Sequence, residues 1–169
     1  MRSLLFIITV FCSFHLFAQT TDQAVIKIKG ITTDGKSFSN IRLKDVTINV
    51  YEANNIIATY PCDDKGRFEF DIPLNDYIVL EFVKDGYFAK RILFDTQNPN
   101  LDLSKTYEPF NFEILMLPYK KDINQYEIDF PITRVEYSVK EKDFIYAEKY
   151  TKRMIKKQEE VMNELSKVD

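Results

Sequence analysis

The segment that most constrains the fold is residues 62–88, with the sequence CDDKGRFEFDIPLNDYIVLEFVKDGYF. Apolar side chains occupy every second position over residues 68–72 and again over residues 78–82. This period of two is typical of β-strands that bury one face. Turn-forming residues flank both runs, at 63–66, 73–76 and 84–87. The segment predicts a small antiparallel β-domain, and it contains no pattern of residues that suggests a reaction centre.

Alternation of the same kind extends the prediction to seven strands, at residues 24–29, 46–51, 56–62, 67–72, 77–83, 88–94 and 110–116. Short strands with a turn every eight to twelve residues are typical of a β-sandwich. We therefore expect a mainly β protein with a seven-stranded antiparallel β-sandwich over residues 24–117. Pro61 places the third strand at a sheet edge, because proline cannot donate to a strand ladder. The strand at 77–83 is apolar on both faces and is expected to be central.

The composition changes after Pro118. We expect a linker over residues 118–142, with a possible short strand at 133–138, and a C-terminal amphipathic helix over residues 143–168. The start of the helix is ambiguous, because Ser138 with Glu141 fits a capping box and Asp143 is also a good N-cap. The apolar stripe of the helix consists of Ala147, Met154, Val161 and Leu165, with Ile155 and Met162 beside it.

Four surfaces could receive this helix. Its stripe could pack on the chain's own sandwich or on a second copy, while its lysines face water. Its basic residues could instead lie on an anionic membrane or an acidic partner protein. Glutamates interrupt the basic face and favour the first pair of alternatives, but the sequence does not choose between them. The oligomeric state is left open for the same reason.

Residues 1–18 have the layout of a secretory signal peptide. Arg2 precedes a mostly apolar run over residues 4–17, and small Ala18 precedes a polar segment. The run is shorter than the roughly 20 apolar residues that a membrane-spanning helix needs. We expect cleavage after Ala18 and a periplasmic or secreted protein without a transmembrane segment. Phe11 before Cys12 argues against a lipid anchor, since a small residue is needed there.

Cleavage would remove the only histidine, His15, and one of the two cysteines, Cys12. The remaining 22 basic and 26 acidic side chains give a net charge of about −4. That balance argues against a nucleic-acid binder, which needs a basic surface. A chain without histidine and with one thiol has no Ser-His-Asp or Cys-His pair and no usual zinc ligand set. We therefore predict no catalytic, metal or cofactor-binding residues, and that the protein is not an enzyme.

A set of short motifs in a fixed order resembles the transthyretin-like, carboxypeptidase-regulatory-like β-sandwich modules of exported bacterial proteins. The resemblance covers residues 24–117. The stretch between Lys36 and Val46 is longer than usual, and Asn75-Asp76 stands where the family often has glycine. The resemblance implies a prealbumin/Ig-like fold and an accessory, non-catalytic module of surface or envelope proteins. The motifs are Gly30, Asp34-Gly35-Lys36, residues 46–50, Asp63-Asp64-Lys65-Gly66-Arg67-Phe68, residues 73–77 and Lys84-Asp85-Gly86-Tyr87.

Three minor chemistries compete with ordinary structural roles in this sequence. Asp63, Asp64 and Asp85 could approach a calcium ion, but their spacing lacks the calcium-loop pattern and turn residues explain them better. An isopeptide bond between Lys27 or Lys29 and Asn111 would need a buried site, whereas alternation places these side chains opposite the aliphatic face. Cys62 lies on the apolar side of its strand and is expected to be a buried, inert thiol.

The predicted function is a non-enzymatic β-sandwich module that acts as a scaffold for protein interaction at the cell envelope, with an envelope or surface protein as its partner. The alternative is a carbohydrate-binding accessory module that binds a glycan. Aromatic side chains on sandwich faces are more often packing residues than sugar platforms. The candidates for sugar stacking are Tyr51, Tyr77, Tyr87, Tyr119 and Tyr126.

Overall fold

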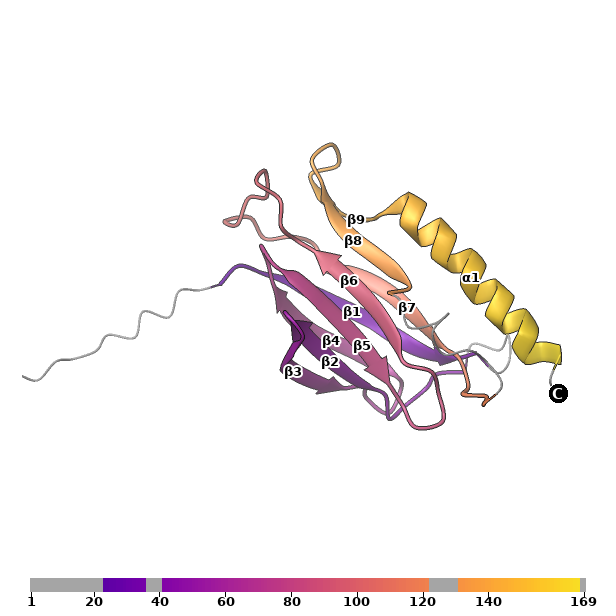
Figure 1. Cartoon of the computed structure of the whole chain (residues 1–169). Coiled ribbons are helices and arrows are strands. Elements are labelled where there is room, and N and C mark those ends of the chain that lie inside the picture. The colour runs from indigo at the N-terminus through magenta and orange to yellow at the C-terminus, as the bar shows by residue number, and fades with distance from the viewer. Residues whose placement is uncertain (1–22, 36–40, 122–130, 168–169) are drawn as a thin grey trace, which may run out of the picture.

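The computed structural model describes residues 23–35, 41–121 and 131–167. The predicted signal peptide and the cleavage site after Ala18 lie outside the described residues. The described part forms nine strands and one helix (Figure 1). These are β1 (Val25–Asp34), β2 (Thr47–Glu52), β3 (Asn55–Pro61), β4 (Arg67–Pro73), β5 (Tyr77–Val83), β6 (Lys90–Asp95), β7 (Phe110–Met116), β8 (Thr133–Ser138), β9 (Asp143–Tyr146) and α1 (Glu148–Lys167).

The strands form a three-stranded sheet in the order β4-β1-β7 and a six-stranded sheet in the order β3-β2-β5-β6-β8-β9. The prediction of a mainly β protein with a C-terminal helix is confirmed. The prediction of seven antiparallel strands is wrong, because both sheets are mixed. β1 pairs with β7 in parallel, and β6 pairs with β8 in parallel. Parallel partners are far apart along the chain, and alternation within one strand carries no information about which strand lies beside it.

The core lies between the inward faces of the two sheets, and the alternating residues supply it. Phe68, Phe70 and Ile72 are buried from β4, and Ile78, Leu80 and Phe82 from β5. The inward-facing assignments for these two strands are confirmed. β3 lies at an edge of the six-stranded sheet and β5 lies inside it, as Pro61 and the two-sided apolarity of residues 77–83 predicted.

β1 continues through Gly30 to Asp34, whereas the sequence suggested an end at the glycine. A Cβ atom at Gly30 would lie 2.1 Å from the carbonyl oxygen of Phe112 and 2.5 Å from the ring of Phe68. Glycine is therefore required here for close approach within the strand, and it does not mark the end of the strand.

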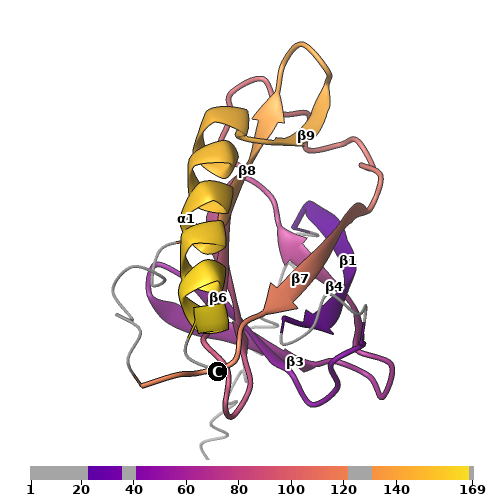
Figure 2. The same ribbon diagram turned by 90° about the vertical axis from the view of Figure 1, so that its right-hand side faces the viewer.

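α1 packs on the chain's own sandwich, alongside β8 and β6 (Figures 1 and 2). The Thr151 and Thr133 hydroxyls share a hydrogen bond of 2.6 Å, and the Tyr150 hydroxyl donates to the Pro131 carbonyl oxygen at 2.6 Å. The side chain of Met154, on α1 itself, is buried at 5% exposure. The structure thus shows the first of the four surfaces considered for the apolar stripe.

The predicted start of the helix at residue 143 is wrong, because Asp143–Tyr146 forms β9 and pairs with β8. Ser138 and Glu141 do form a cap-like hydrogen bond, from the Glu141 amide to the Ser138 hydroxyl at 3.2 Å. That hydrogen bond closes the turn between β8 and β9, so the same local chemistry serves a hairpin here. The β-structure consequently extends beyond residue 117 into the predicted linker.

Candidate functional site

A row of polar side chains crosses the outer face of the six-stranded sheet. The strand registers place Asn49 beside both Thr59 and Glu81, and Glu81 beside Arg91. Asn49 Nδ2 donates to Glu81 Oε2 at 3.3 Å, and Arg91 Nε and Nη2 donate to Glu81 Oε1 at 2.9 and 2.8 Å. The Tyr51 hydroxyl adds a fourth hydrogen bond, to Glu81 Oε2 at 2.9 Å. The carboxylate is thereby held in one orientation.

Glu81 is only 7% exposed, so its charge depends on these partners. Burial by itself raises the pKa of a carboxyl group, because it disfavours the charged form. The hydrogen bonds from Arg91, Tyr51 and Asn49 outweigh burial and lower the pKa of Glu81 below its ordinary value. Glu81 and Arg91 are therefore both charged at neutral pH and balance each other.

A cleft of about 510 Å³ lies over this row. Two of the predicted tyrosines line it from neighbouring strands: Tyr51 of β2, which is partly buried, and Tyr77 of β5, which is 49% exposed. The volume lies within the range of small-molecule sites, which combine apolar and aromatic walls with a few fixed polar groups. The remaining lining residues are Ala53, Asn54, Val79, Glu81, Arg91 and Pro131. We call this feature the tyrosine cleft.

The other predicted tyrosines do not join the tyrosine cleft. Tyr87 lines a different hollow with Asp45 and Lys84. Tyr119 is 53% exposed and its ring packs against Phe88 at 5.1 Å between centroids. Tyr126 lies outside the described residues.

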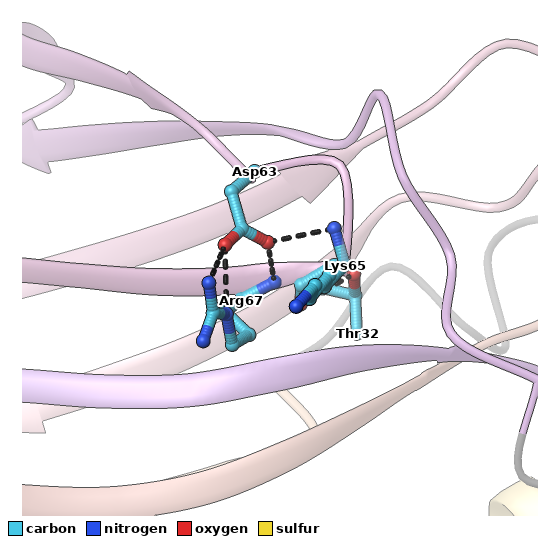
Figure 3. Close-up of polar contacts among 5 residues, drawn as sticks. Thr32, Asp63, Lys65 and Arg67 are labelled. Carbon is cyan, nitrogen blue, oxygen red and sulfur yellow. Dashed lines mark hydrogen bonds and ion pairs between the residues drawn. The ribbon is translucent and has the colours of Figure 1, made fainter.

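Asp63 is a turn residue in the structure, as the sequence suggested. Its carboxylate accepts hydrogen bonds from the Lys65 amide at 2.9 Å, the Arg67 amide at 2.8 Å and Arg67 Nε at 2.7 Å (Figure 3). The hydrogen bonds from the backbone and then from the side chain of Arg67 lower the pKa of Asp63 to about 2. Asp85 lies in another turn, beside Lys84 and Asp45. Among the described residues, no group of three or more histidine, cysteine or acidic side chains is placed to hold a metal ion.

Cys62 is buried and unpaired. Burial raises the pKa of its thiol; a hydrogen bond from the Thr32 hydroxyl opposes the rise and the charge of Asp63 adds to it. Because the thiolate is the reactive form, a raised pKa favours an inert thiol.

Lys29 and Asn111 are register neighbours on β1 and β7. Lys29 Nζ lies 3.1 Å from Glu69 Oε1 with its side chain 37% exposed, and Asn111 Nδ2 donates to the Pro109 carbonyl oxygen at 2.8 Å. Lys27 forms a second ion pair, with Asp71 at 3.3 Å. These solvent-facing pairs do not provide the buried site that an isopeptide bond needs.

Three buried charged residues, Glu81, Lys90 and Asp95, were not predicted from the sequence, and the first two lie in apolar registers. Glu81 organises the tyrosine cleft, and Lys90 is 0% exposed on the inward face of β6. A signal for both was present. Lys90 shares its register with Phe88, Ile92 and Phe94, and Glu81 follows Val79 on the second apolar face of β5. A charged residue inside an apolar register is expected to be paired or to have a shifted pKa.

Comparison with known proteins gives similarity at the level of fold. No protein-family model matches the chain, and no curated protein matches it. Among solved structures, it is similar to the TIE protein of Bacillus anthracis, with 13% identity and a TM-score of 0.44 over 56% of this chain and 17% of that one. It is also similar to catechol 1,2-dioxygenase of Acinetobacter, with 10% identity and a TM-score of 0.43 over 70% and 60%.

A third structure with a β-rich fold of this kind is 3-chlorocatechol 1,2-dioxygenase of Rhodococcus opacus, with 11% identity and a TM-score of 0.40 over 59% of this chain and 62% of that one. The chain spans less than two thirds of each of these three structures. At such identities the similarity concerns the β-rich fold alone.

The prediction that the chain is not an enzyme is contradicted by its fold-level similarity to enzymes. It rested on the missing histidine and the single thiol, yet the structures with a similar β-rich fold include dioxygenases, which are enzymes. Catalysis depends on residues placed on a fold and is not fixed by the fold itself. The similarity assigns no reaction to this chain.

No helix in the described part of the chain is long and apolar enough to cross a membrane.

Proposed function

We propose that the protein is an exported β-sandwich module, released by cleavage after Ala18, that binds a protein partner at the cell envelope through the free edge of β3. We further assign the sandwich to the transthyretin-like, carboxypeptidase-regulatory-like modules that its turn motifs resemble. The partner is an extended segment of another protein that adds a strand beside β3.

The observation that carries this proposal is the composition of the β3 edge. Edge strands usually carry charges, prolines or bulges that prevent pairing with another chain. The other edge strands, β4, β7 and β9, each contain at least one charged residue, whereas β3 has none in NIIATYP. Ile56 and Ile57 on β3 are 54% and 45% exposed. Its only protections are Pro61 at one end and a register shift opposite Val50 and Tyr51.

Site-directed cross-linking tests this function. A photoreactive amino acid at Ile57, in cells that export the full chain, is expected to give one discrete cross-linked adduct. Ile56→Lys should abolish the adduct, because a buried interfacial lysine is costly. The matched control is the same photoreactive residue at Val139, which is 54% exposed beyond β8, towards the opposite edge of the sheet. Adducts of equal yield from both positions, or none from Ile57, would contradict the proposal.

The tyrosine cleft favours a second candidate function, binding of a neutral saccharide. Its two tyrosine rings offer surfaces for a sugar ring, and the charge-balanced Glu81–Arg91 pair gives no preference for an anionic ligand. Tyr77→Ala is expected to lower glycan-array signals at least about tenfold, the loss of about 1.4 kcal/mol of binding free energy. Tyr119→Ala is the matched control, because Tyr119 is similarly exposed but lies outside the cleft. Equal signals from both variants would exclude the cleft.

A further inference from the structure

Lys90 is buried beneath α1 at the end of the sandwich core. Its side chain lies on the same face of β6 as Ile92 and Phe94, and its cross-strand neighbour on β5 is Phe82. Val161 of α1 is also buried, at 4% exposure, in a cluster with Phe88 and Leu117. The lysine is fully buried with the helix docked, and its amine contacts the helix directly.

The partner of the Lys90 amine comes from the helix itself. Lys90 Nζ donates to Gln158 Oε1 at 3.0 Å, and no ion pair to Nζ forms among the described residues. An ammonium group has three N–H donors, and a single carboxamide oxygen satisfies only one of them. A buried charge without a counter-charge strongly disfavours the arrangement in which α1 is docked over Lys90. Burial accordingly lowers the pKa of Lys90 to about 8.

The charged groups on the surrounding elements are directed elsewhere. On β5 and β6, Glu81 and Arg91 pair with each other on the outer face of the sheet. On β7, Glu113 accepts a hydrogen bond from Thr33. Further charged residues are Asp95 on β6 and Glu136 on β8, which both pair with Arg134 of β8, and the exposed Lys157, Glu159 and Glu160 beside Gln158 on α1. None of these side chains compensates the charge on Lys90.

We propose that α1 is a releasable cover. At neutral pH it detaches from the sandwich as a unit while the sandwich stays folded, and it is held more firmly as the Lys90 amine loses its proton. The contacts that oppose release include the Thr133–Thr151, Tyr150–Pro131 and Lys90–Gln158 hydrogen bonds. Among the side chains of α1 that the structure describes, only Met154 and Val161 are buried. Elements with few buried contacts are those that open locally. Release would uncover Lys90 and the apolar surface around it.

The direction of the pH effect follows from linkage. With the helix docked the pKa of Lys90 is about 8, against 10.5 for an unburied lysine. The charge on the Lys90 amine therefore weakens docking of α1 to its full extent below pH 8. This weakening disappears as the pH rises from 8 to 10.5. The two values correspond to a change of up to about 300-fold in the docking equilibrium.

Trypsin cleavage tests the proposal in the full exported chain, because α1 is rich in lysine and arginine and cleavage reports the open fraction. At pH 7.5 the wild-type helix should be cut faster than that of Lys90→Met, by up to about 200-fold. At pH 9.5 the ratio of the two rates should be smaller by about 20-fold. Taking the ratio removes the pH dependence of the protease itself.

Gln158→Glu is the second variant, since it places a carboxylate beside the ammonium without a large change in helix propensity. It should slow cleavage of α1 at pH 7.5, whereas Glu159→Gln, at an exposed neighbouring position, should not. NMR titration of the Lys90 side chain should give a midpoint near 8. A midpoint near 10.5, or a wild-type to Lys90→Met ratio that is the same at both pH values, would overturn the proposal. If Lys90→Met fails to fold, Gln158→Glu and the titration decide.

Discussion

Gly30 is a residue at which the packing leaves no room for a side chain. Replacing it with alanine would bring a Cβ to 2.1 Å from the carbonyl oxygen of Phe112 and 2.5 Å from the ring of Phe68. The backbone of β7 must then shift, because a carbonyl group cannot rotate away within a ladder. We expect Gly30→Ala to lower the free energy of unfolding by about 2–3 kcal/mol in urea titration.

Gly86→Ala is the matched control for this substitution. Gly86 has a φ of +78°, and nothing lies within 4 Å of a Cβ built there. The free energy of unfolding of the control should fall by only about 1 kcal/mol, the backbone cost of an L-residue in the left-handed region. Equal losses in the two variants would show that steric contact is not what fixes glycine at position 30.

Asp63 is the residue whose hydrogen bonds predict an acid sensitivity. Its folded pKa of about 2 lies below the ordinary value of 3.8, because the amide and side chain of Arg67 donate to the carboxylate. A depressed pKa contributes stability above pH 3.8 that is lost as the pH falls towards 2. Asp63→Asn should have a lower Tm than wild type at pH 6, and the difference should shrink between pH 4 and pH 2.

The neighbouring Asp64 provides the comparison for Asp63. Asp64 is exposed in the same turn, so Asp64→Asn should follow the wild-type Tm at every pH. A Tm difference between wild type and Asp63→Asn that stays constant from pH 6 to pH 2 would show that the carboxylate charge does not support the turn.

At the scale of elements, the sequence was sufficient wherever the signal was local. The alternation of apolar residues identified seven strands and their inward faces, and Pro61 identified an edge. It was insufficient where the answer depended on distant partners. The parallel pairing of β1 with β7 joins residues about 80 positions apart, and nothing within either strand specifies it.

The candidate site shows the same division. The tyrosines were recognised as candidates, but only the order β2-β5-β6 brings Tyr51, Glu81 and Arg91 together. The end of the chain shows it too, because Ser138 with Glu141 satisfies the pattern of a helix cap and closes a hairpin turn instead. Local chemistry of this kind fits two structures, and tertiary pairing decides between them.

The docking of α1 gives a prediction at this scale. Met154 is 5% exposed beneath the helix, while the adjacent Ile155 is 48% exposed on its outer side. Met154→Ala removes buried packing worth about 2–4 kcal/mol in a well-packed site. Trypsin should therefore cleave α1 of the Met154→Ala variant much faster than α1 of the wild type. Ile155→Ala should change the rate little, and a larger effect from Ile155 would mean that α1 presents the other face to the sandwich.

At the scale of the whole molecule, the domain does not end where the last predicted sandwich strand ends. β8 pairs with β6, and β9 pairs with β8, so residues beyond 117 complete the larger sheet. Val135 and Phe144 from these strands are 0% and 5% exposed within the main core. The predicted unit of residues 24–117 therefore lacks part of its own core and leaves β6 as an unpaired edge.

Three lengths of the chain test this view: residues 19–117, 19–147 and 19–169. Removing Val135 and Phe144 forfeits about 3–6 kcal/mol of burial, a large part of the 5–15 kcal/mol that stabilises an ordinary domain. We expect residues 19–117 to show no cooperative thermal transition, and residues 19–147 to unfold cooperatively at a lower Tm than the full length. A cooperative transition of residues 19–117 at the Tm of residues 19–147 would instead show that β8 and β9 are appended to a sandwich that is complete without them.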